Sequence, residues 1–346
     1  MYLDITSINL KNSKEVKEVE EFLKNFDLKL DNNIDYTVVI KDNDKIKATC
    51  SKSKNVFKCF AISDDLRGEG IANRLVTAMN NRLFEEGVYH SFVYTKPENK
   101  DIFKGIGYKE VYEVEKVVLL ENGIYDINRY LDNLIQKNNM NLDTKKAALV
   151  MNCNPFTKGH RYLIERAASE NEEVLVFIVE EDKSLFPFDI RFNLVKEGVK
   201  DLENVTVIPG GEYIISQATF SSYFLRHEDD VLSAYTRIDA GIFSKYYCPK
   251  LNIVARYVGE EPYCNVTNSY NNALQEKLGE AGVEVKVIKR KEYDNTAISA
   301  SKVRNLIKED RLNEVEEIVP NVTWMFLNTL DGKIIREKIK VSNSVH

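Results

Sequence analysis

Four consecutive residues, Thr157-Lys158-Gly159-His160, have the types and spacing that could act on a phosphate group. They follow an apolar run and open an amphipathic pattern, which predicts a helix N-terminus at this point. Thr157 can cap that helix, and Gly159 leaves room for a ring or a ribose close to it. His160 then lies in the first turn, where the helix dipole favours an anion, and Lys158 adds a cation. An imidazole here can stabilise the charge that builds on a phosphate leaving group.

A second stretch, "ISASKVR" at 298–304, comes after the last predicted strand. Ser299 and Ser301 can cap a helix and supply hydroxyls, and Arg304 lies about one turn further along the same face. This arrangement suits a triphosphate held against a helix N-terminus. Either stretch alone also fits a capped helix with surface side chains, so the argument for a nucleotide site depends on both.

The elements that would position these residues alternate regularly in the second half of the chain. Strand patterns occur at "AALVMNC", "EVLVFIVE", "NVTVI", "LNIVARYV" and "VEVKVIK", and helical patterns separate them. Such alternation predicts a parallel sheet with right-handed crossovers. Ligands of these sheets bind beyond the carboxyl ends of the strands, where both stretches are expected to lie.

The first half contains a candidate phosphate-binding turn of another kind. "RGEGIA" follows the strand pattern "NVFKCFAIS" and precedes the helical pattern "GIANRLVTAMNNRLFEEG". Its glycines, Gly68 and Gly70, allow successive backbone N–H groups to point at a pyrophosphate, beside Arg67 and Ala72. The alternative is an ordinary tight turn that enters a helix.

Composition sets the limits within which these motifs are interpreted. A chain of 346 residues is expected to form two domains, and we place them at 1–120 and 147–346 with a connecting helix and linker at 121–146. The net charge of -6 argues against nucleic acid as a partner. The apolar runs are too short to span a membrane, and the N-terminus lacks a secretory pattern. Five unpaired cysteines favour reduced thiols, so a cytoplasmic protein is expected.

Two family resemblances follow from these motifs. Thr157–His160 and Ile298–Arg304 resemble the two signatures of the nucleotidylyltransferase superfamily, although Thr157 stands where the commoner signature has histidine. "RGEGIA" and the later block "FKGIGYKEV" resemble the GNAT acetyltransferases. The resemblance implies an α/β chain with a GNAT-like α+β N-terminal domain and a Rossmann-like C-terminal domain with a parallel sheet.

Several further blocks resemble the citrate (pro-3S)-lyase ligase family, among them "EDKSLFPFDIR", "YIISQATFSSYFLR" and "RYVGEEPYCNVTNSYN". This resemblance implies a ligase that uses ATP and acetate to acetylate the thiol of the citrate lyase acyl carrier subunit. Magnesium is expected to bind with ATP. The thiol belongs to a coenzyme-A-like arm, for which Arg67, Gly68, Gly70 and Ala72 are the expected contacts.

The expected catalytic residues are His160, Arg304 and Lys158. The expected ATP-binding residues are Asn154, Phe156, Thr157, Gly159, His160, Ser299, Ser301 and Arg304. Phe103 stands where GNAT enzymes often have a proton-donating tyrosine, so the first domain is expected to bind the arm without transferring acetyl from it. The alternatives are an adenylyltransferase that makes a stable coenzyme precursor, an acetyltransferase with a decayed second domain, and a non-catalytic carrier-binding protein.

Overall fold

The computed structural model describes residues 4–31, 33–180, 184–215, 220–225, 227–260 and 265–342. Its contacts divide the chain into two compact units. The first unit combines Met1–Leu134 with the distant segment Ser221–Ile238, and the second combines Ile135–Phe220 with Asp239–His346. The first unit therefore includes a segment from the middle of the second half, which the sequence patterns do not indicate.

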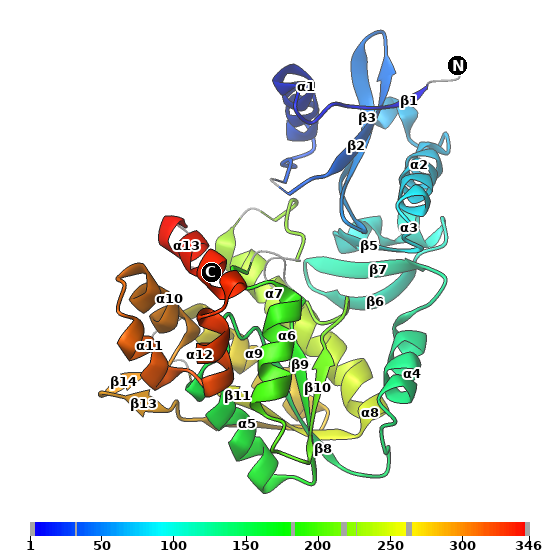
Figure 1. Cartoon of the computed structure of the whole chain (residues 1–346). Coiled ribbons are helices and arrows are strands. Elements are labelled where there is room, and N and C mark those ends of the chain that lie inside the picture. The colour runs from blue at the N-terminus through cyan, green and yellow to red at the C-terminus, as the bar shows by residue number, and fades with distance from the viewer. Residues whose placement is uncertain are drawn as a thin grey trace. The chain divides into compact units, whose positions relative to one another are not determined.

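A seven-stranded sheet forms the first unit, in the order β1-β2-β3-β4-β5-β7-β6 (Figure 1). The strand patterns "YTVVI" and "KIKATCSK" on either side of "KDND" predict a hairpin. The structure confirms it, because β2 and β3 pair antiparallel across a turn in which Asn43 and Asp44 have positive φ. Both residue types tolerate that conformation better than most. The strands are β1 Ile5–Ser7, β2 Tyr36–Asp42, β3 Lys45–Ser53, β4 Val56–Ile62, β5 His90–Thr95, β6 Lys109–Val114 and β7 Val117–Gly123.

Apolar residues at helical spacing place α2 against this sheet. Leu75 and Met79 of α2 are fully buried and share one core with Ile40 and Leu120 of the strands. Such burial contributes roughly 1.5–3 kcal/mol for each large side chain. The helices of this part are α1 Ser13–Lys24, α2 Ile71–Glu85, α3 Lys100–Lys104 and α4 Ile127–Lys137. α4 lies inside the segment where a connecting helix is predicted, and the division between the units follows its residue Leu134.

Five parallel strands form the sheet of the second unit, in the order β10-β9-β8-β11-β12, as the sequence alternation predicts. The order reverses beside β8, so the carboxyl ends of β8 and β11 border the crevice where ligands of such sheets bind. The strands are β8 Lys146–Met151, β9 Glu173–Ile178, β10 Val205–Pro209, β11 Ile253–Gly259 and β12 Glu284–Ile288. A two-stranded hairpin, β13 Glu292–Tyr293 and β14 Thr296–Ala297, follows.

Helices cover both faces of this parallel sheet. Val176 of β9 belongs to the core shared with α5 and α6, whereas the next residue, Phe177, packs against Phe243 and Tyr247. Successive strand residues point to opposite faces, so the two contacts mark two covered faces. The helices of this unit are α5 Lys158–Glu170, α6 Phe188–Gly198, α8 Cys248–Leu251 and α9 Asn265–Glu280, with a π-helical turn at Phe243–Tyr247. α7 Glu228–Ile242 begins in the segment that belongs to the first unit, which ends at Ile238.

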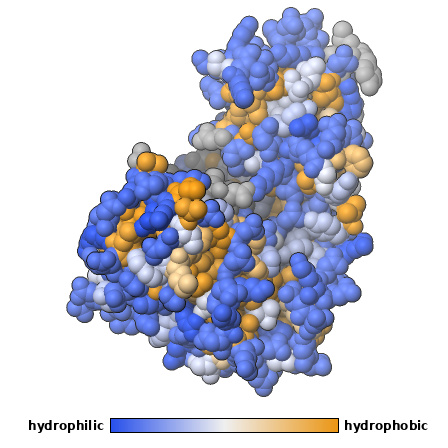
Figure 2. Space-filling model, viewed as in Figure 1, coloured by the Kyte–Doolittle hydropathy of each residue, from blue (hydrophilic) through white to orange (hydrophobic). Residues whose placement is uncertain are grey.

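Four further helices pack together after the hairpin, around a core of their own. They are α10 Ala300–Lys308, α11 Leu312–Ile318, α12 Asn321–Leu327 and α13 Leu330–Val341. The face in Figure 2 is mostly hydrophilic, and apolar atoms gather over the region of α12 and α13, where Met325, Leu330 and Ile334 are exposed. Within the described ranges, no helix has both the length and the apolar character that a membrane span requires.

Candidate functional site

The first turn of α5 is closed by a reciprocal cap between Thr157 and His160. The Thr157 hydroxyl accepts the backbone N–H of His160 at 3.2 Å, and the Thr157 N–H donates to Nδ1 of His160 at 3.1 Å. Helices usually place Glu or Gln at this third position, and here an imidazole serves instead. Because Nδ1 accepts, the ring proton resides on Nε2. The predicted cap by Thr157 is confirmed, and it also orients the imidazole.

The electrostatic surroundings keep this imidazole neutral. Burial, and to a smaller degree the positive charge of Arg290, lowers the pKa of His160 to about 4. His160 is therefore a neutral hydrogen-bond donor at physiological pH. Arg290 follows β12 and donates from Nε to the carbonyl of Glu260 at 2.8 Å. Sequence reasoning missed Arg290, although its position just beyond the carboxyl end of a parallel strand was an available signal.

The two motifs meet in space although more than a hundred residues separate them. A Cβ at Gly159 would lie 2.8 Å from the carbonyl oxygen of Ile298, so only glycine fits there without a shift. Arg304 donates from Nη1 to the carbonyl of Asn154 at 2.6 Å. Packing against Ile298 therefore explains why position 159 is glycine, whereas the sequence alone suggested the close approach of a ring or a ribose. Its missing side chain lets the second motif approach α5.

Arg304 is almost buried, with 6% of its surface exposed. Its Nη2 atom donates to the Ser301 hydroxyl at 3.3 Å, and burial lowers the pKa of Arg304 from the ordinary arginine value. Ser299 is the N-cap of α10 and accepts the Lys302 N–H at 3.0 Å, which confirms the predicted cap. Arg304 therefore joins α10 to the strand–helix turn at Asn154.

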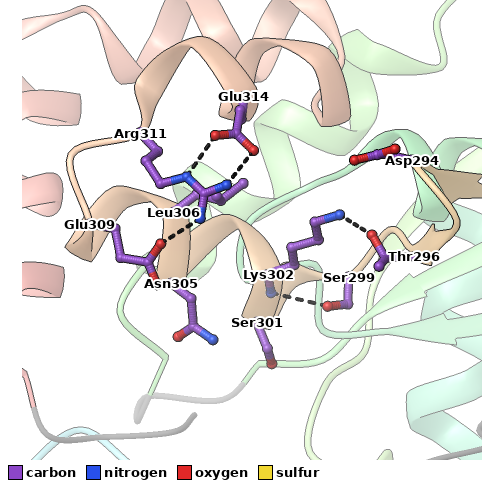
Figure 3. A pocket seen from close by; sticks show the side chains of 10 residues that line it. All are labelled: Asp294, Thr296, Ser299, Ser301, Lys302, Asn305, Leu306, Glu309, Arg311 and Glu314. Atoms are coloured by element: carbon purple, nitrogen blue, oxygen red, sulfur yellow. Dashed lines mark hydrogen bonds and ion pairs between the residues drawn. The ribbon is translucent and has the colours of Figure 1, made fainter.

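A surface cavity of about 490 Å³ opens beside the start of α10 (Figure 3). Ser299, Ser301 and Lys302 line one side of it, and Glu309 and Glu314 lie on the other. The two glutamates are paired with Arg311, so that side has little net positive charge to offer a phosphate. Only the hydroxyl side resembles a phosphate site.

Two predicted site residues have structural contacts of their own. Phe156 is fully buried, where a Cβ at Gly198 would lie 2.5 Å from its ring, and it stacks against His160 with ring centroids 6.2 Å apart. Lys158 donates from Nζ to the carbonyl of Glu317 at 2.8 Å, at the end of α11. A cation at a helix C-terminus is favourable in itself. This contact explains the position of the Lys158 side chain without any ligand, so the expected catalytic role of Lys158 rests on the sequence alone.

Asn154 and Arg191 hold the loops at the carboxyl edge of the sheet. The Asn154 side chain accepts the Phe186 N–H at 3.1 Å. Arg191 is fully buried and donates to the carbonyls of Asn152 and Val179, at 2.7 and 2.8 Å. The sequence leaves open whether Arg191 binds an anion, and these contacts favour the structural role. The same question arises for Lys183 in the block "EDKSLFPFDIR", and that residue lies outside the described ranges.

No group of three His, Cys, Asp or Glu side chains that could hold a metal ion occurs among the residues described.

The expected arm-binding turn opens α2 in the first unit. Gly68 and Gly70 have φ of 83° and 72°, in the left-handed region that favours glycine, and a Cβ at either would meet open space. Arg67 is exposed and pairs with Asp64 at 3.0 Å, while Ala72 is the second residue of α2. The first N–H groups of α2 have no partner within the helix. Phe103 is buried in the core of this unit.

The lowered pKa of His160 predicts a pH-dependent stability. Between the unfolded value near 6.5 and the folded value of about 4, the unfolded chain binds more protons at this site, so the free energy of unfolding falls as pH falls. We expect the wild type to lose about 2 kcal/mol between pH 7 and pH 5 relative to His160→Gln, which keeps a cap but does not titrate. Chemical denaturation at both pH values measures this difference. If both proteins lost the same free energy of unfolding between the two pH values, the lowered pKa of His160 would be contradicted.

Comparisons with known proteins agree with both units. A model of the citrate lyase ligase C-terminal domain matches residues 146–327, and an acetyltransferase (GNAT) domain model matches residues 10–127. The chain is 37% identical over 331 residues to a [citrate [pro-3S]-lyase] ligase of Escherichia coli (strain K12), covering 94% of each chain. It is 34% identical over 326 residues to the enzyme of that name from Klebsiella pneumoniae, covering 93% of this chain and 95% of that one.

A phosphopantetheine adenylyltransferase of Thermobifida fusca is 40% identical over 55 residues, which cover 15% of this chain and 34% of that one. The likeness to this enzyme is thus local, whereas the likeness to the ligases extends over nearly the whole chain. The expected fold, a GNAT-like unit followed by a Rossmann-like unit, is confirmed by the domain match and the parallel sheet. On this evidence the chain belongs to the citrate lyase ligase family.

Proposed function

We propose that this enzyme activates acetate with ATP and transfers the acetyl group to the thiol arm of the citrate lyase acyl carrier subunit. In the first step, an oxygen of acetate attacks the α-phosphorus of ATP, and pyrophosphate leaves. In the second step, the sulfur attacks the acetyl carbon of acetyl-adenylate, AMP leaves, and the thiol proton passes to solvent. The relatives named as ligases and the arrangement of the two phosphate motifs support this proposal.

The adenylation step depends mainly on position and charge. The cap on Thr157 fixes Nδ1 of His160, so Nε2–H is the donor that remains for a phosphate oxygen. Arg290 adds a positive charge close enough to lower the pKa of that imidazole, after the larger effect of burial. Ser299 and Ser301 supply hydroxyls at the start of α10. Together these groups would stabilise the charge that builds on the leaving pyrophosphate.

The triphosphate would carry Mg²⁺ into the site. Magnesium usually keeps several waters and binds through phosphates and one or two carboxylates. The hydroxyl side of the cavity at α10, with Ser299 and Ser301, suits such a hydrated complex better than the side with Glu309 and Arg311.

The first unit would hold the coenzyme-like arm through the turn at Gly68 and Gly70. Left-handed glycines and the free N–H groups of a helix start form a cradle for a pyrophosphate, and Arg67 adds a positive charge. Phe103 cannot donate a proton, so the unit would bind the arm without transferring acetyl from it.

The contact of Gly159 with Ile298, together with the bond from Arg304 to Asn154, carries this proposal, because it brings the two distant motifs together, as a shared phosphate site would require. Pyrophosphate release from ATP, measured with and without acetate and then with the carrier, tests it. Acetate-dependent release followed by carrier acetylation is expected. A coenzyme-precursor adenylyltransferase would need a phosphorylated cosubstrate instead of acetate, and a carrier-binding protein would release no pyrophosphate.

Replacing Arg304 by alanine should weaken ATP binding more than AMP binding. Losing a charge-assisted bond to a phosphate costs about 1.5–3 kcal/mol, which corresponds to a loss of affinity of roughly ten- to a hundredfold. Isothermal titration with each nucleotide measures the difference. Arg166→Ala is the matched control, because Arg166 pairs with Glu170 on α5 and lies outside both motifs. Equal weakening of ATP and AMP would mean that Arg304 only joins the two motifs.

A further inference from the structure

The sheet of the first unit divides between β4 and β5. These two strands pair in parallel only at Val56 with Phe92 and at Phe57 with Val93. β4 nevertheless continues to Ile62, and β5 continues to Thr95. Beyond the last pair, the two inner edges form a notch in which backbone groups of one strand do not bond those of the other. Such edges attract any chain that carries amide groups.

The side chain of Tyr223 bridges the notch. Tyr223 belongs to Ser221–Ile238, the later segment of the chain that forms part of this unit. Its hydroxyl donates to the carbonyl of Tyr94 in β5 at 3.4 Å. The backbone N–H of Phe60 in β4 interacts with the same hydroxyl and lowers the Tyr223 pKa, against the larger effect of burial, which raises it. The carbonyl of Tyr223 accepts the Lys29 N–H at 3.3 Å. One side chain thus touches both strands just beyond the point where their pairing ends.

The surroundings hold Tyr223 in this position. It is 6% exposed, and its ring meets Phe224 edge to face with centroids 5.0 Å apart. Further along the same segment, Asp230 of α7 forms an ion pair with Lys116 at 2.7 Å. Because burial raises its pKa, Tyr223 stays protonated and keeps its bond to β5 at any physiological pH. The notch is therefore closed by a fixed side chain.

We propose that Tyr223 excludes the acyl-thioester end of a pantetheine-type arm from the β4–β5 notch. The inference rests on the proposed function, in which the turn at Gly68 and Gly70 holds the phosphate end of that arm. A thioester carbonyl in the notch would need a hydrogen bond from the N–H of Phe60 in β4. An amide of the arm would need the carbonyl of Tyr94 in β5 as its acceptor. Tyr223 already uses both groups. The sulfur is then left outside the notch, where it can be delivered to acetyl-adenylate.

Calorimetric binding to the full chain tests this exclusion. For the wild type, we expect acetyl-coenzyme A and adenosine 3′-phosphate 5′-diphosphate, which keeps the pyrophosphate but lacks the pantetheine arm, to bind with affinities within about threefold of each other. Tyr223→Ala should bind acetyl-coenzyme A at least about tenfold more tightly than the wild type does, with the affinity for the adenosine nucleotide unchanged. Tyr223→Phe is the matched control: it frees the two backbone groups, but its ring still fills the notch, so its affinity for acetyl-coenzyme A should rise by no more than about threefold.

Thermal melts establish that each variant is folded, and the comparison of the two ligands on the wild type needs no variant. If the wild type bound acetyl-coenzyme A ten times more tightly than the adenosine nucleotide, the exclusion would be overturned, as it would be by a folded Tyr223→Ala with wild-type affinities. Binding of neither ligand to the wild type would instead refute the arm site of the proposed function, and this inference with it.

Discussion

The His160→Ala variant is expected to release pyrophosphate from ATP and acetate at least about a hundredfold more slowly than the wild type, the scale for losing one preorganised charge stabiliser. The reason lies in the geometry of the imidazole. Nδ1 accepts the Thr157 N–H, and the ring is neutral because burial lowers its pKa to about 4, so Nε2–H is a fixed donor. A single-turnover pyrophosphate assay at saturating ATP measures the loss.

The same substitution also removes half of the helix cap, which costs about 0.5–2 kcal/mol of stability. His160→Gln separates the two effects, because glutamine at this position can restore the cap. We expect the glutamine variant to melt close to the wild type and still to be slow. If the glutamine variant were fast and only the alanine variant slow, the histidine would serve the helix start and not the chemistry.

Replacing Gly70 by valine is expected to reduce carrier acetylation by about a hundredfold or more, while acetate-dependent pyrophosphate release stays near the wild-type rate. A φ of 72° is strongly disfavoured for a β-branched residue, so the turn that presents N–H groups at the start of α2 would rearrange. The thiol would then lose the high effective concentration that a held arm provides. Acetylation of the carrier, followed by mass spectrometry, measures the loss.

The chain offers a matched control at the other end of the same helix. Gly87 has a φ of 75°, and a Cβ there would also meet open space. Gly87→Val should therefore lose similar stability to Gly70→Val without affecting acetylation. Equal loss in both variants would attribute the effect to α2 as a whole. A loss of pyrophosphate release in Gly70→Val would contradict the division of labour between the two units.

Deleting the first half is a poorer test of that division than these point substitutions. The first unit includes Ser221–Ile238, and Tyr223 and Asp230 of that segment contact residues before position 120. Removing residues 1–120 would expose the side chains of Ser221–Ile238, a segment that remains in the truncated chain. The structure therefore favours single-residue changes that leave every packed surface in place.

The sequence by itself determined what depends on neighbours along the chain. Thr157 and Ser299 cap helices because each needs only a backbone N–H a few residues ahead. The strands of the parallel sheet and the hairpin at Asn43 were equally predictable, because apolar period and turn preference are local signals. The family resemblance added that the two motifs work together, without the geometry by which they meet.

Only the tertiary structure decided which distant groups touch. It placed Ile298 against Gly159, turned Lys158 toward the end of α11, and brought Arg290 near His160. It also carried Tyr223 into the sheet of the first unit. A local pattern fixes which face of an element is apolar, but the partner of a side chain depends on how elements pack and on which buried polar groups must be satisfied. Those conditions involve the whole fold, so no window of the sequence contains them.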